Sequence, residues 1–346
     1  MKTAIKSKLL FVPVVLCAMV YSSCKSFIPE SLDALGDDVN YTTKEFAPTL
    51  GRKTIYENAA NVGNTSSLPL EFKLVNVRTV DGAPATELTD KFPVKVWKKS
   101  YTGDETSIEE IESKREVQYR SILEVGKNSG DIMFWDFGTS DWIRTQPDSC
   151  YVFDVEISNS GGRKYARNLR LKPYKQRPYE PSQYNAVTGL ATNEALYPSS
   201  TSNLYGEKTG DYIFGSEIQV FLFKDVSNTK PGGSLSISVM DSLNNPIDVQ
   251  KFKDTKWDNM IHGFNPEFKN NKVTYTVAYP IPLVQYPTQY TTNDGSRAQI
   301  ALRYNRIGFA GALIQAHIGF NFAIYEEGHW EIQFRFRGES PKFDNE

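Results

Sequence analysis

Apolar and polar residues alternate with a period of two along several segments in the second half of the chain. Leu235, Ile237 and Val239 alternate with serines, and residues 273–277 alternate two valines and a tyrosine with threonines. Successive side chains of a strand point to opposite faces, so this spacing predicts half-buried β-strands. Residues 218–223 are apolar on both faces, which predicts a strand in the middle of a sheet.

The last two alternating segments carry the strongest pattern. Residues 318–324 and residues 330–336 each keep one apolar face, and they are separated by Glu326-Glu327-Gly328-His329. Two such runs joined by a short turn containing glycine predict a C-terminal β-hairpin. Residues 308–325 are apolar enough to resemble a membrane helix, but the polar side chains inside this stretch favour buried strands.

The first half has weaker strand patterns and one predicted helix. Strands are expected near residues 70–75, 93–98, 122–125 and 132–135, and Ser107 followed by Glu110 forms a capping box before one short helix. The clearest element is Tyr151–Ser158. The loop Asn159-Ser160-Gly161-Gly162 and a second apolar run follow it, which predicts a β-hairpin. A tyrosine opening such a hairpin resembles the last hairpin of immunoglobulin-like or fibronectin-like sandwiches.

The chain divides into five predicted parts. The length exceeds one usual core, so we expect an all-β protein with two tandem β-sandwiches, immunoglobulin-like or jelly-roll-like, and one short helix in the first. The expected boundaries are a signal peptide at 1–23, a lipidated tether at 24–45, the first sandwich at 46–174, a proline-rich linker or long loop at 175–210, and the second sandwich at 211–346.

The N-terminus has the order of a secretory signal peptide. Three lysines precede residue 9, residues 9–20 are largely apolar, and Ser22 and Ser23 stand before Cys24. A cysteine at the cleavage point resembles the lipobox of bacterial lipoproteins, which implies lipidation of Cys24 and anchoring in a membrane through acyl chains. The alternative is an ordinary secreted protein in which the cysteine occurs by chance.

Composition and motif searches exclude several kinds of chemistry. The net charge is −2 and becomes more acidic when the signal lysines are removed, which argues against nucleic-acid binding. The three histidines, His262, His317 and His329, have no metal-ligand spacing, so we expect no metal site and no cofactor. Serine-hydrolase and phosphate-binding motifs are absent. Cys150 and His317 each lie in apolar surroundings, which favours core residues over reactive ones.

Two aromatic clusters are the candidates for carbohydrate binding. Trp135 and Trp142 lie beside Asp136 and Asp141 in WDFGTSDW, which resembles a sugar subsite. The alternative is a strand that ends in a polar turn with its aromatic side chains in the core. The aspartates are also the best local pair for a glycoside hydrolase, which needs two facing carboxyl groups.

The second cluster is a proline-rich loop over residues 279–290. Its three prolines prevent a regular strand and stiffen the loop, so that Tyr286 and Tyr290 would bind a sugar ring at little entropic cost. Gln285 and Gln289 are placed to bond sugar hydroxyls. The alternative is a crossover loop with its tyrosines packed against the sandwich.

Together these features resemble a Bacteroidota lipoprotein family of unknown function associated with starch-utilisation-type outer-membrane systems. The matching segments are Cys24, KxFxPxxGR from Lys44, LPLxFxLVN from Leu68, and the aromatic C-terminus. The resemblance implies a lipid-anchored outer-membrane protein that assists nutrient capture. Lys25, Ser26 and Phe27 replace the acidic export cue of surface lipoproteins, which leaves the membrane face open.

Three functions are compatible with this sequence. The first is a non-catalytic glycan-binding accessory protein whose ligand is a polysaccharide. The second is a structural or assembly partner of an outer-membrane transporter complex. The third, with the least support, is a glycoside hydrolase with an unrecognised carboxylate pair.

Overall fold

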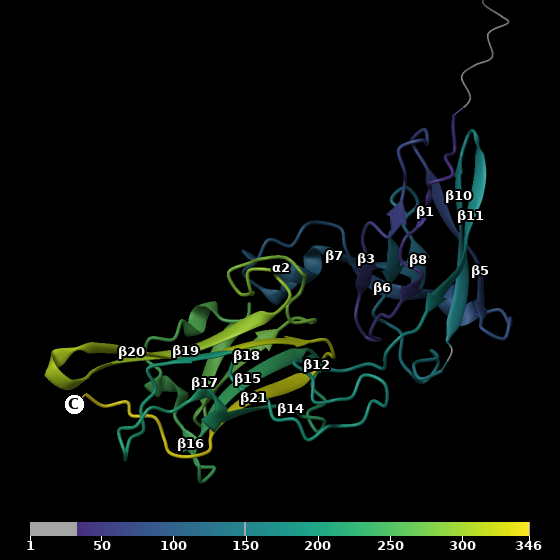
Figure 1. Ribbon diagram of the computed structural model, residues 1–346. Helices are drawn as coiled ribbons and strands as arrows, with labels where there is room; N and C mark the ends of the chain where they lie inside the picture. The colour runs from purple at the N-terminus through teal and green to yellow at the C-terminus, as the bar shows by residue number, and fades with distance from the viewer. Residues whose placement is uncertain (1–32, 149, 346) are drawn as a thin grey trace, which may run out of the picture.

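The computed structural model describes residues 33–148 and 150–345 (Figure 1). The predicted signal peptide and Cys24 lie outside these residues. The described chain is mostly β-structure in several sheets, with one short α-helix, α2 (Ile108–Ser113), which confirms the predicted all-β fold. None of the helices in this part of the chain has the length and apolar character needed to span a membrane.

The first half is built around a four-stranded sheet with smaller sheets beside it. The main sheet has the order β2 (Glu45–Phe46), β11 (Gly162–Leu171), β10 (Tyr151–Asn159) and β5 (Glu71–Thr79). The smaller sheets pair β1 (Asn40–Tyr41) with β4 (Ala60–Asn61), β9 (Ile132–Phe134) with β3 (Thr54–Tyr56) and β8 (Leu123–Val125), and β6 (Lys91–Trp97) with β7 (Arg115–Ser121). The predicted β10–β11 hairpin is confirmed, because Asn159 pairs with Gly162 across a two-residue turn.

The second half contains two larger sheets. The six-stranded sheet has the order β14 (Ile218–Lys224), β21 (His329–Phe336), β15 (Gly233–Met240), β18 (Lys272–Val277) and β17 (Phe264–Lys269), with β16 (Pro246–Ile247) paired to β15. In the other sheet, β20 (Leu313–Ile324) pairs with β19 (Ala298–Ile307), β12 (Tyr179–Glu180) and β13 (Ser200–Ser202). Short 3-10 turns complete the described elements: η1 (Thr86–Leu88), η2 (Gly215–Glu217), η3 (Val249–Lys251), η4 (Trp257–Asn259) and η5 (Phe309–Gly311).

Two strand predictions in this half are wrong. The last two strands do not form a hairpin, because β20 pairs with β19 while β21 pairs with β14 and β15 in the other sheet. The rings of Phe320 and Phe334 meet edge to face, 6.1 Å apart, so the two strands pack through their apolar side chains. β14 stands at the end of its sheet and not in its middle, and Phe223 on its outer face is exposed.

Two clusters of buried side chains form the cores of the two halves. The first includes Val39 and Tyr41, which are buried, so the predicted tether over residues 24–45 is wrong at its C-terminal end. The second includes Tyr179, Leu196 and Leu204 from the predicted linker or long loop. Residues 175–210 therefore contribute to the second core and do not simply connect the halves.

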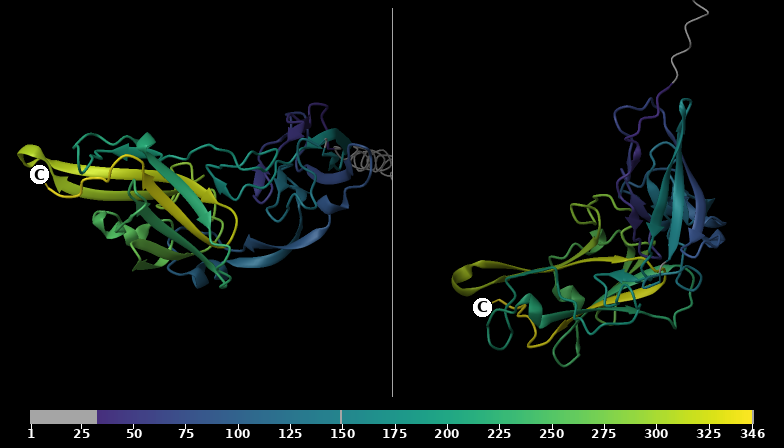
Figure 2. Two further views of the ribbon diagram at one scale, coloured as in Figure 1. Left: turned by 90° about the horizontal axis from the view of Figure 1, so that it is seen from below. Right: turned by 45° about the vertical axis from the view of Figure 1, so that its right-hand side comes forward.

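The two halves meet at an angle, and β6 and β7 extend from the first toward the second (Figure 1). At the opposite end of the second half, the β19–β20 hairpin projects beyond the rest of the fold in both views of Figure 2. The segment between β6 and β7, residues 98–114, carries α2. We call this segment the junction loop, because its side chains contact the second half.

Candidate functional site at the junction

The junction loop is closed at its base and capped inside. The backbone N–H groups of Lys98 and Lys99 both donate to the carbonyl oxygen of Lys114. Inside the loop, Ser107 Oγ accepts a hydrogen bond from the Glu110 N–H at 3.1 Å, which confirms the predicted helix cap. The Glu110 carboxylate accepts from Thr106 N–H at 2.8 Å, so the returning bond of the capping box goes to the residue before the cap.

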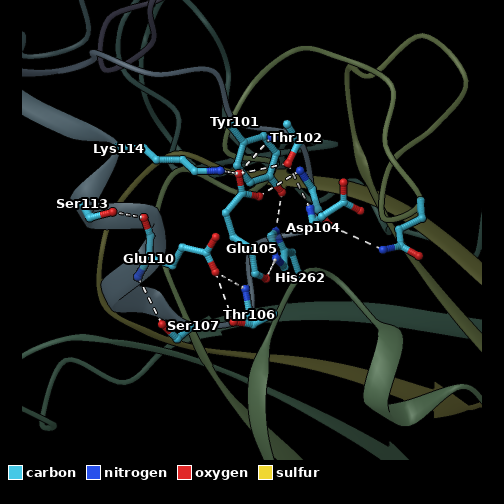
Figure 3. Close-up of polar contacts among 12 residues, drawn as sticks. Tyr101, Thr102, Asp104, Glu105, Thr106, Ser107, Glu110, Ser113, Lys114 and His262 are labelled. Atoms are coloured by element: carbon cyan, nitrogen blue, oxygen red, sulfur yellow. Dashed lines mark hydrogen bonds and ion pairs between the residues drawn. The ribbon is translucent and has the colours of Figure 1, made fainter.

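Glu105 is the buried charge of this loop. Its side chain has no exposed surface and forms an ion pair with Lys114 (Figure 3). The carboxylate also accepts hydrogen bonds from the N–H groups of Thr102 at 3.0 Å and Gly103 at 2.9 Å. Burial alone would raise the pKa of Glu105, but Lys114 and the backbone donors outweigh it and lower this pKa to about 2. Glu105 is therefore ionised at neutral pH and fixes the shape of the loop.

His262 joins the junction loop to the second half. Its Nε2 lies 2.7 Å from the carbonyl oxygen of Glu105, and its Nδ1 is hydrogen-bonded to the hydroxyl of Tyr101 (Figure 3). A carbonyl oxygen only accepts, so the Nε2–H group of His262 donates to Glu105. The ring of Tyr290 stacks on His262 with centroids 4.5 Å apart and planes 6° apart. His262 is thus held on two edges and one face.

The backbone at His262 is strained. Ile261 and His262 both have positive φ angles, 55° and 51°, and both side chains are buried. A positive φ is unfavourable for a side chain branched at Cβ such as isoleucine and costs about 1–3 kcal/mol. The contacts of His262 across the junction hold this conformation in place.

The proline-rich loop is fixed at both ends. Tyr279 and Ile281 are buried, and Ile281 exchanges two backbone hydrogen bonds of 2.7 Å with Ile324 of β20. At the other end, Thr291 Oγ1 accepts from the N–H of Thr288 at 2.8 Å. The loop is therefore held by the core, in agreement with the stiffness predicted from its prolines.

The predicted binding residues of this loop have different environments. Tyr286 is 63% exposed, and the side chains of Gln285 and Gln289 are also exposed. Gln289 Nε2 donates to the Tyr290 hydroxyl at 3.2 Å. Tyr290 is half-buried against His262, and burial raises the pKa of its hydroxyl. Tyr286 is the ring that a ligand can reach, while Tyr290 contributes to the junction.

The two predicted tryptophans do not form a joint platform. Trp135 is buried, its Nε1–H donates to Glu124 at 3.1 Å, and Lys53 Nζ lies 4.6 Å from its ring centroid. The prediction that a sugar stacks on Trp135 is therefore wrong, because packing and charged neighbours cover its ring. Trp142 is 36% exposed and lies against Phe92 and Phe137.

A groove of about 340 Å³ lies beside the junction, between α2 and β17. Its polar lining includes Ser107, Glu109 and Asp258, and its apolar lining includes Ile108 and Phe264. Mixed polar and apolar walls suit a ligand with hydroxyl groups and apolar faces. No local pattern predicts this groove, because its walls come from segments about 150 residues apart.

The other residues singled out from the sequence have structural environments. Cys150 is buried, and burial raises the pKa of its thiol to about 11, so the thiolate is scarce at neutral pH. His317 is half-buried and hydrogen-bonded to Ser200 at 3.0 Å, and burial lowers its pKa. Within residues 33–148 and 150–345, no group of three potential metal ligands is present.

The sequence does not predict that His262 meets Tyr101 and Glu105, because about 160 residues separate His262 from these two and no motif connects them. Comparisons with curated proteins and with solved structures find no match. A comparison with protein families does find one, and it spans both halves and the junction. The family described as Domain of unknown function (DUF5007) matches residues 61–345, which is most of the chain, and the protein belongs to that family.

Proposed function

We propose that this protein is a lipid-anchored, non-catalytic glycan-binding protein of the bacterial outer membrane that assists nutrient capture. The signal-like N-terminus and Cys24 support the anchor, and the resemblance to Bacteroidota lipoproteins supports the location. The two β-sandwich halves and the fixed loop between Tyr279 and Tyr290 support a binding role. The ligand is a polysaccharide, and no cofactor is required.

The observation that carries this proposal is the exposed ring of Tyr286 on a loop that is already ordered. Flat rings bind the apolar faces of pyranose rings, and a fixed loop loses little conformational entropy on binding. Gln285 precedes Tyr286 in the sequence and is exposed, so its amide can bond a sugar hydroxyl. The amide of Gln289, three residues after Tyr286, is already hydrogen-bonded to Asn259 and Tyr290.

Affinity electrophoresis of the mature protein against a panel of polysaccharides tests the proposal. We expect retardation by at least one polysaccharide and loss of most of this retardation in Tyr286→Ala. Tyr119→Ala is the matched control, because Tyr119 is 67% exposed but lies on β7. Absence of retardation across the panel, or equal retardation of Tyr286→Ala and the parent, would contradict the proposal.

A second candidate function is assembly with an outer-membrane complex. The observation that favours it is the apolar tip of the projecting β19–β20 hairpin, where Phe309 is 87% and Leu313 60% exposed. Exposed apolar clusters of this kind mark contact sites between proteins. If this function applies, Phe309→Ser would separate the protein from its membrane complex in blue native electrophoresis, while Val226→Ser, at an equally exposed site on the second half, would not.

A further inference from the structure

Arg52 and Arg177 share Glu180 beside Tyr325, and the charge of Arg297 also acts on the Tyr325 hydroxyl; we call these three residues the arginine cluster. Arg52 comes from the first half, Arg177 from the connecting segment and Arg297 from the second half. The Cζ atom of Arg52 lies 4.1 Å from the centroid of the Tyr325 ring. Arg177 and Arg297 are also among the charged groups that act on the Tyr325 hydroxyl.

The cluster has more positive than negative charge. Glu180 is the acidic group that acts on Tyr325 alongside the three arginines. Its Oε1 atom accepts from Arg52 Nη2 at 2.8 Å and lies 3.1 Å from Arg177 Nη2. Within the described part of the chain, no ion pair of Arg297 is found. One carboxylate oxygen therefore serves two guanidinium groups, and a third guanidinium has no acidic partner there.

Part of the hydrogen-bonding capacity of the cluster is unused. The Nε–H groups of Arg52 and Arg177 are buried and have no hydrogen-bond partner among the described residues. Buried N–H groups are normally paired, so Glu180 leaves part of the donor capacity of these two guanidinium groups unsatisfied. The side chains of both arginines keep some exposed surface, 14% for Arg52 and 23% for Arg177, so their outer edges are accessible.

One turn connects Arg297 of the cluster to the proline-rich loop over residues 279–290. The Thr292 N–H donates to the carbonyl oxygen of Arg297 at 2.8 Å, which closes the turn over residues 292–297. Gly295 packs so closely on the backbone of Tyr286 that an added Cβ would lie 2.3 Å from the Tyr286 carbonyl carbon. Arg297 follows two residues later, within about 7 Å of Gly295 along the chain. The backbones of Tyr286 and Arg297 are therefore joined through one tight turn.

We propose that the arginine cluster binds the carboxylate or sulfate groups of an acidic polysaccharide. The inference rests on the proposed glycan-binding function and adds the charge class of the ligand. Guanidinium groups pair with carboxylate and sulfate through two parallel N–H donors, which suits a site with donors left over. Glu180 holds the arginines together when no ligand is bound and competes with the ligand for them.

The test compares pairs of polysaccharides that differ in charge and share a backbone. Isothermal titration calorimetry of the mature protein would use dextran sulfate against dextran, and polygalacturonate against its fully methyl-esterified form. We expect the acidic member of at least one pair to bind about tenfold more tightly, and this preference to weaken as salt is raised.

Single substitutions test which residues cause the preference for acidic polysaccharides. Arg297→Gln removes no ion pair seen among the described residues and should abolish most of the preference, as should Arg177→Gln. Glu180→Gln should strengthen acidic binding, an effect opposite in sign to that of general structural damage. Arg167→Gln, at an exposed arginine of β11, is the control and should leave binding unchanged.

The outcomes separate this inference from the proposed function. Equal affinity for neutral and acidic members would overturn the arginine-cluster site and leave glycan binding intact. A preference that survives in Arg297→Gln and Arg177→Gln would also overturn the site, because general electrostatic attraction would then explain it. Binding of none of these polymers would overturn the inference, and the wider polysaccharide panel would decide the proposed function.

Discussion

Replacement of Glu105 by glutamine should destabilise the protein in a manner that depends on pH. Glu105 has a pKa of about 2 in the folded protein, against an ordinary value of 4.5. The difference corresponds to about 3 kcal/mol of stabilisation at neutral pH, at 1.36 kcal/mol per pH unit. Glutamine keeps one acceptor oxygen for the N–H of Thr102 or Gly103, but it loses the other acceptor and the ion pair with Lys114, so we expect a loss of about 2–3 kcal/mol at pH 7.

The pH dependence follows from the direction of this shift. A carboxyl group whose pKa is lowered on folding stabilises the protein above its unfolded pKa, and the stabilisation is lost as the pH falls. The difference between the parent and Glu105→Gln should be constant above about pH 5 and shrink to about 1 kcal/mol at pH 3. Glu109→Gln, at an exposed carboxylate of α2, is the control.

Urea denaturation at pH 7, 5 and 3 measures this directly, with tyrosine and tryptophan fluorescence as the signal. A change in unfolding free energy below 0.5 kcal/mol at pH 7 would show that the Glu105–Lys114 pair adds almost nothing to stability, which is the usual finding for exposed ion pairs. A change of equal size at every pH would show that the glutamine acts through packing and not through charge. Either result would refute the account of the junction loop.

Three further predictions concern other parts of the molecule. Tyr290→Ala should lower the melting temperature in differential scanning calorimetry, because the ring of Tyr290 stacks on His262. Tyr290→Phe keeps the ring and should leave the melting temperature unchanged. Equal melting temperatures for the parent and the alanine variant would show that the stacking is unimportant. Cys24→Ala should release the protein from membranes in cell fractionation, since the acyl chains supply the membrane affinity, and unchanged fractionation would contradict lipidation. Deletion from Gly328 onward removes β21 from between β14 and β15 and should prevent folding of the second half; a calorimetric profile that keeps every transition of the parent would contradict this.

The alternation of apolar residues was sufficient to predict strands but not their partners. Residues 318–324 and 330–336 were correctly expected to have one buried face. The same pattern is produced by a hairpin within one sheet and by two strands that face each other across a core. The turn at residues 325–328 connects two sheets, and nothing in its composition distinguishes that connection from a hairpin turn. The position of β14 was missed for a similar reason, because an edge strand can also carry aromatic residues on its outer face.

The candidate site was predictable where local chemistry determines it. The prolines of residues 279–290 indicated a fixed loop, and the structure holds this loop at both ends. Which tyrosine is exposed depends on His262, a residue distant in sequence that covers Tyr290 and leaves Tyr286 free. Trp135 was misjudged because its cover comes from Lys53 and Glu124, on other strands or loops.

The junction network could not be derived from sequence. Tyr101, Glu105 and His262 are ordinary residues in polar or mixed surroundings, and only the folded chain brings them together. The positive φ angles of Ile261 and His262 have no signature either, since glycine or asparagine would be expected at such positions. Long-range packing therefore decides the site, while local patterns decide its scaffold.

The measurement that tests the central claim most directly compares two substitutions of Tyr286 by isothermal titration calorimetry with the polysaccharide that retards the parent most. Tyr286→Phe keeps the ring and should bind with nearly the affinity of the parent. Tyr286→Ala loses the ring and should bind at least about fivefold more weakly, with an unchanged melting temperature, because a central stacking ring contributes more than about 1 kcal/mol to binding. Equal affinities for the phenylalanine and alanine variants would contradict stacking at Tyr286 and with it the proposed binding face.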